Sequence, residues 1–158
     1  MYAYHATLKK NQKSIEENGL VLNQSKYNDN NYYVENQLFF TWLSAEEAYD
    51  VVSFMIDDSL DDHPELKNEE IIVYAIDIHD FDIDHIKYDY NYNCDSYDEI
   101  KTFAYTAPIP PEKLILIDPK EISGDKWYCD KEDLLKSDDE FVQRIVEKLE
   151  VIFEEVSS

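Results

Sequence analysis

The sequence has only two glycines, Gly19 and Gly124, among its 158 residues. So few glycines exclude both the GxGxxG loop and the P-loop, which cradle phosphate groups with glycine-rich backbone. The chain also lacks the GxSxG nucleophile elbow and the HExxH zinc motif. Its two cysteines, Cys94 and Cys129, cannot build a disulfide framework, and they show no metal-ligand spacing with the four histidines. Acidic neighbours make both thiols poor nucleophiles, because negative charge raises the pKa of a thiol.

Long hydrophobic runs are also missing. No stretch reaches the roughly 18 consecutive apolar residues that a membrane-spanning helix needs, and the N-terminus does not have the basic and then apolar pattern of a signal peptide. We therefore expect a cytoplasmic protein that makes no membrane contact. A length of 158 residues predicts a single domain, residues 1–158, and 44% hydrophobic residues are enough for a core.

Positive charge is scarce. Lysine and arginine number 14 against 36 acidic residues, which gives a net charge of −22, and Arg144 is the sole arginine. We expect no direct binding to nucleic acid, because that affinity comes largely from basic side chains on phosphates. Two interpretations remain open. The charge can serve solubility, or an acidic face can imitate nucleic acid or dock on a basic protein partner.

Apolar periodicity and turn residues predict an α+β fold with a largely antiparallel sheet. Ser44 with Glu47, and Ser137 with Glu140, are each typical of a capping box at a helix start. Gly19 suits the end of the first helix. The run at 70–78 is apolar on both faces and is expected to be the central strand. Residues 23–36 are expected to form a loop, and residues 118–136 an irregular segment. Strands are predicted at 1–7, 38–42, 70–78, 100–106 and 113–117, and helices at 8–19, 44–56 and 138–156.

Several short segments occur in a notable order. A strand carries Tyr4-His5-Ala6-Thr7, a short helix ends in Asn18-Gly19-Leu20, an aromatic strand Leu38-Phe39-Phe40-Thr41 leads to Ala48-Tyr49, and the last strands flank Ala107-Pro-Ile-Pro-Pro-Glu112. Together they resemble the ADP-ribosyltransferase-like fold, in the branch with a His-Tyr-Glu active site. The resemblance covers residues 1–117 and leaves 118–158 as a C-terminal extension with an amphipathic helix at 138–156. It implies split antiparallel sheets, flanking helices and an NAD-binding cleft between the sheets.

The resemblance also implies roles for particular residues. His5 would contact the ribose on the nicotinamide side, the backbone near Ala6 would hold the carboxamide, and Thr7 would support that strand. Tyr49 would stack on the nicotinamide ring, with Phe40 and Thr41 nearby. This chemistry suits an oxocarbenium-like transition state, which an aromatic clamp and negative charge stabilise.

The catalytic carboxylate departs from the pattern. Alignment on Ile109-Pro-Pro puts Thr102 where the family has glutamate. Glu99 is our candidate for the catalytic carboxylate, and three upstream aspartates, Asp89, Asp95 and Asp98, are further candidates. If the strand is regular, Glu99 points to the opposite sheet face from Thr102.

Two functions of different classes follow. The first is NAD-dependent ADP-ribosyltransfer to a host protein or a small molecule. The alternative is a catalytically inactive acidic module that mimics nucleic acid or inhibits a basic, nucleic-acid-binding partner. The small, acidic, Asn- and Tyr-rich composition is compatible with a phage anti-defence protein or a toxin. The related removal of 2′-phosphates from RNA relies on several arginines, which this chain does not have.

Overall fold

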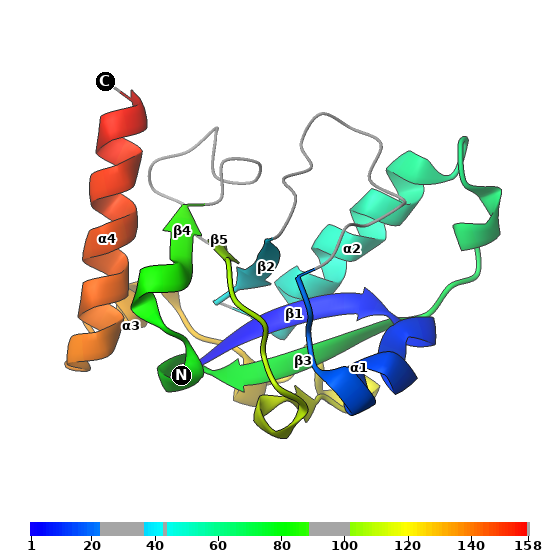
Figure 1. The fold of residues 1–158 in the computed structure, drawn as a ribbon, viewed down its shortest axis with the longest axis horizontal. Coiled ribbons are helices and arrows are strands. Elements are labelled where there is room, and N and C mark those ends of the chain that lie inside the picture. Colours follow the sequence, from blue (N-terminus) through cyan, green and yellow to red (C-terminus); the bar gives the residue numbers. More distant parts are fainter. Residues whose placement is uncertain (23–36, 43, 89–101, 158) are drawn as a thin grey trace.

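The structure, a computed structural model, describes residues 1–22, 37–42, 44–88 and 102–157 (Figure 1). Side chains are described for these residues apart from 88 and 151–157. Within this part of the chain, six antiparallel strands and four α-helices confirm the α+β class. The strands are β1 (Tyr2–Leu8), β2 (Leu38–Thr41), β3 (Ile71–Asp77), β4 (Ile86–Tyr88), β5 (Thr102–Tyr105) and β6 (Ile115–Leu116).

The strands form one sheet in the order β4-β5-β2-β1-β3-β6. We expected two separate sheets, and the structure instead joins the strands through β1 and β2. That junction consists of one registered pair, Tyr4 with Thr41, whereas β1 and β3 share seven pairs from Tyr2–Asp77 to Leu8–Ile71. Figure 1 shows β4, β5 and β2 running in a different direction from β1 and β3. The sheet therefore has two three-stranded halves with a narrow connection.

Helices cover both faces of the sheet. The face that we call the α1 face is covered by α1 (Gln12–Asn18) and α4 (Glu140–Ser157), and it buries an aromatic and aliphatic cluster that includes Ile15, Phe40, Tyr74, Phe103, Ile145 and Leu149. The opposite face, the α2 face, is covered by α2 (Ala45–Ser59) and by the segment around Trp127. Its smaller cluster includes Tyr4, Ala45, Ala48, Val73 and Ala75. Alternation along β1 and β3 thus explains why β3 is buried on both sides, as a central strand is.

Two predicted helix ends are confirmed. Ser44 Oγ accepts a hydrogen bond from the Glu47 N–H at 3.0 Å, which caps α2. Gly19 ends α1 with φ at +76°. The next residue pairs with a distant segment, because Leu20 and Ile109 exchange backbone hydrogen bonds of 2.8 and 2.9 Å. We call this pair the Leu20–Ile109 clasp, and it joins two of the segments that carry the resemblance.

Other boundaries were predicted less well. The 8–19 helix is a 3-10 turn, Lys9–Asn11, followed by α1. The predicted 113–117 strand is reduced to β6, because Pro111–Lys113 forms a 3-10 turn. Strand β4 was missed inside an acidic stretch, and α3 (Lys131–Leu135) was missed inside the supposedly irregular segment. The second capping box is wrong, because Asp139 rather than Ser137 caps α4 through the Phe141 N–H at 2.9 Å.

Candidate functional site

His5 lies at the narrow junction of the sheet. The β1–β2 pairing stops at Tyr4–Thr41, so a regular ladder would next place Ala6 opposite Phe39. Instead, the carbonyl of Phe39 accepts a hydrogen bond from His5 Nδ1 at 2.9 Å. A side chain therefore bridges β1 and β2 at the point where the registered pairing of the two strands ends.

This hydrogen bond defines the chemistry of the His5 ring. A carbonyl oxygen only accepts, so Nδ1 must carry the hydrogen, and in the neutral ring Nε2 is left as an acceptor. Burial lowers the pKa of His5 below its usual value, although the bond to the Phe39 carbonyl acts in the opposite direction. His5 is thus a neutral imidazole near pH 7, and its Nε2 can accept a hydrogen bond from a hydroxyl group.

The neighbours of His5 on the α1 face are aromatic. Tyr74 is its registered partner on β3, and the Phe40 ring centroid lies 5.5 Å from that of His5. Phe40 is itself buried against Phe81 and Phe103, so its ring is part of the core rather than an open stacking surface. Tyr74 was missed by the sequence reasoning. Its hydroxyl is buried and has no hydrogen-bond partner among the described residues, and burial raises its pKa.

Three other predicted site residues, Ala6, Thr41 and Tyr49, belong to the α2 face, as does Thr102 at the position of the missing glutamate. Thr41 pairs with both Tyr4 and Thr102, and paired residues share a face of the sheet. Both threonines are buried, and the Thr41 hydroxyl donates to the Ser44 carbonyl at 3.1 Å. Tyr49 lies on α2 with 37% of its surface exposed. The structure therefore brings His5 and Phe40 together, whereas Thr41 and Thr102 face the other side of the sheet and Tyr49 lies on the helix that covers that side.

The remaining predictions have different outcomes. Thr7 is partly buried on β1, in register with Ile72, and its hydroxyl accepts from the Asn11 amide at 3.1 Å. This bond ties the strand to the turn before α1. The four candidate carboxylates lie outside the described residues: Asp89, Asp95, Asp98 and Glu99. The predicted loop at 23–36 lies outside them as well.

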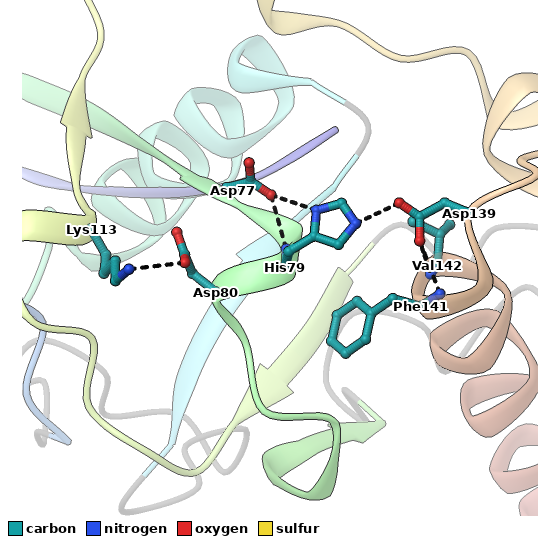
Figure 2. A network of polar contacts seen from close by, with 7 residues as sticks. All are labelled: Asp77, His79, Asp80, Lys113, Asp139, Phe141 and Val142. Carbon is teal, nitrogen blue, oxygen red and sulfur yellow. Dashed lines mark hydrogen bonds and ion pairs between the residues drawn. The ribbon is translucent and has the colours of Figure 1, made fainter.

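A second polar cluster links the end of β3 to α4 (Figure 2). His79 Nδ1 bonds Asp77 Oδ1 at 2.8 Å, and His79 Nε2 bonds Asp139 Oδ2 at 2.5 Å. Since both ring nitrogens face carboxylates, the charged imidazolium is favoured, and the bonds to Asp77 and then Asp139 raise the pKa of His79. The sequence did not indicate this cluster, because its two ends are 60 residues apart. It fastens the cap of α4 to the sheet.

Other kinds of site are not found in the described part of the chain. No group of three or more His, Cys, Asp or Glu residues there is arranged to hold a metal ion. Burial and then the nearby Asp133 raise the pKa of the Cys129 thiol, which disfavours the nucleophilic thiolate. Among the described helices, none combines the length and apolar character needed to cross a membrane.

Comparisons with known protein families, with curated proteins and with solved structures gave no match.

Proposed function

We propose that this chain is an NAD-dependent ADP-ribosyltransferase-like protein that modifies a protein or a small molecule. The observation that carries the proposal is the position of His5, a neutral imidazole at the narrow connection between two three-stranded halves of the sheet. The structure has one sheet rather than the split sheets that the resemblance implies, but the narrow connection between its two halves keeps part of that division. The Leu20–Ile109 clasp adds support, because it brings together two sequence segments on which the resemblance rests.

The chemistry of His5 suits the ribose of NAD. Its Nε2 can accept a hydrogen bond from a ribose hydroxyl, which would hold the sugar while the bond to nicotinamide breaks. A developing oxocarbenium ion also needs a nearby carboxylate. Thr102 is not a carboxylate and belongs to the opposite face from His5. We therefore assign the carboxylate role to Glu99, with the three upstream aspartates as further candidates.

Two variants test this assignment. His5→Asn keeps an amide donor for the Phe39 carbonyl but has no counterpart of Nε2, so we expect the fold to persist while NAD binding is lost. Glu99→Gln should keep NAD binding and lower nicotinamide release by at least about 100-fold, the usual scale for a positioned catalytic group. His63→Gln, at a histidine away from the junction, is the control. Binding is measured by calorimetry, and transfer by labelled NAD with a bacterial lysate.

The outcomes separate the possibilities. If wild-type protein neither binds NAD nor releases nicotinamide, the enzymatic proposal is wrong. If it binds NAD but His5→Asn binds equally well, the site is elsewhere. Folding of each variant is checked by its thermal unfolding curve, so that a loss of structure is not mistaken for a loss of function.

Two observations favour a second candidate, a catalytically inactive acidic binding module. The position that should carry glutamate is a buried threonine, and the net charge of the chain is −22. Such a module would bind a basic protein without NAD turnover, and its affinity would fall steeply as salt screens the charges. Binding that is insensitive to salt would count against this alternative.

A further inference from the structure

The outward side of α2 combines an exposed aromatic ring with acidic residues. The helix packs on the sheet through Ala45 and Ala48, which are buried. Phe54 points away from that contact, with 69% of its surface exposed, and is the most exposed large hydrophobic residue in the described part of the chain. A single exposed apolar residue is ordinary on a protein surface, so its surroundings decide whether it has a role.

Carboxylates surround Phe54 at helical spacing. Asp50 precedes it by four residues, and Asp57 and Asp58 follow by three and four, so all three lie beside the ring on the helix surface. All three are exposed, and none forms an ion pair with a cation among the described residues. The helix has no lysine or arginine. We call Asp50, Phe54, Asp57 and Asp58 the Phe54 patch.

The Phe54 patch does not stabilise the isolated helix. Glu46 and Glu47 in the first turn interact favourably with the helix dipole, but Asp57 and Asp58 lie near the C-terminal end, where negative charge is unfavourable. No basic residue in the last turn offsets them. The largely exposed Phe54 likewise adds little buried apolar surface to the fold.

We propose that the Phe54 patch binds a basic protein surface, on which lysines and arginines surround an apolar pocket that receives the Phe54 ring. Charge complementarity selects this partner. A second copy of the chain would bring like charges together, and nucleic acid or an anionic membrane would be repelled by the same carboxylates. Aromatic residues at the centre of an interface commonly supply most of its binding energy, whereas surrounding charges control specificity and association rate. The proposal does not depend on NAD chemistry.

A designed peptide provides the test. The probe is a 20-residue amphipathic helix of lysine and leucine, and its partner control replaces every leucine with serine. Affinities are measured by fluorescence anisotropy at about 0.15 M salt, where charges are screened beyond about 8 Å. We expect Phe54→Ala to weaken binding of the lysine–leucine peptide about tenfold or more, as for a central aromatic contact. The double variant Asp57→Asn/Asp58→Asn should weaken it several-fold and reduce its salt dependence.

Matched controls distinguish the patch from the general negative charge of the protein. Tyr128→Ala removes another exposed aromatic ring, and Glu121→Gln/Asp125→Asn removes two exposed carboxylates elsewhere. Both should leave the affinity within about twofold. The proposal is overturned if these controls weaken binding as much as the patch variants, or if the leucine-free peptide binds equally well. A dimer in sedimentation that Phe54→Ala dissociates would also overturn it. Nicotinamide release should be unchanged in Phe54→Ala, so failure here is separate from failure of the NAD proposal.

Discussion

Replacing Gly19 with alanine tests the Leu20–Ile109 clasp. A Cβ at this position would lie 2.1 Å from the Ile109 carbonyl oxygen, and the positive φ of +76° disfavours any L side chain. A strained backbone of this kind costs about 1–3 kcal/mol. If the clash opens the clasp, its two hydrogen bonds add about 1 kcal/mol each. We therefore expect Gly19→Ala to lower the free energy of unfolding by about 3–5 kcal/mol.

The measurement is urea unfolding followed by circular dichroism, with the thermal midpoint as a second readout. For a chain of this length the predicted loss corresponds to a decrease of roughly 10 °C in Tm. Gly124→Ala is the matched control, since Gly124 has an ordinary φ of −83° and its added Cβ would meet the Glu121 carbonyl at 3.1 Å. That variant should change stability by less than about 1 kcal/mol in either direction. Equal effects of the two substitutions would refute the clasp.

Three further predictions concern the core and the second polar cluster. Tyr74→Phe should keep or raise stability, by up to about 1 kcal/mol, because it removes a buried hydroxyl without a described partner, and a clear loss would show that the hydroxyl is bonded. Leu149→Ala should cost about 2–5 kcal/mol in urea unfolding, since Leu149 lies on α4 and its side chain is fully buried in the α1-face cluster, and a cost below about 1 kcal/mol would mean that α4 detaches easily. The raised pKa of His79 means that its stabilising contribution is fully present below about pH 6.5 and is lost as pH rises through the folded-state value. His79→Gln should therefore lose more stability at pH 6 than at pH 9, and a constant difference across this range would contradict the ionic role.

Local features of the fold could be predicted from the sequence where one residue type has a strong local preference. Ser44 with Glu47 indicated a helix start, and Gly19 indicated a helix end, because each depends on neighbouring backbone alone. Strand β3 was evident from its continuous apolar run. In contrast, nothing in the sequence indicated β4. This short strand lies between acidic and tyrosine-rich segments, and Ile86 is the one residue of β4 that is described as buried, so there is no alternation of apolar and polar residues to indicate a strand.

The candidate site was harder to predict because it depends on which strands pair and in which register. The sequence indicated His5, but the face on which Thr102 lies follows from its pairing with Thr41. The burial of Phe40 follows from aromatic neighbours on β5 and in the Phe81 segment, which are distant in sequence. The same applies to His79, whose partner Asp139 lies 60 positions away. Periodicity reports which residues are apolar, and it contains no information about such pairings.

The single-pair junction between β1 and β2 also has a mechanical consequence. Backbone hydrogen bonds make each three-stranded half stiff along its ladders, whereas the two halves share one registered pair and the bond from His5 to Phe39. Much of the resistance to bending across the junction must then come from packed side chains, both in the α1-face cluster and beneath α2, which contacts strands of both halves. Packing of this kind yields in shear more readily than a hydrogen-bonded ladder. Under an applied force, we expect the sheet to part first along this line, with each half still intact.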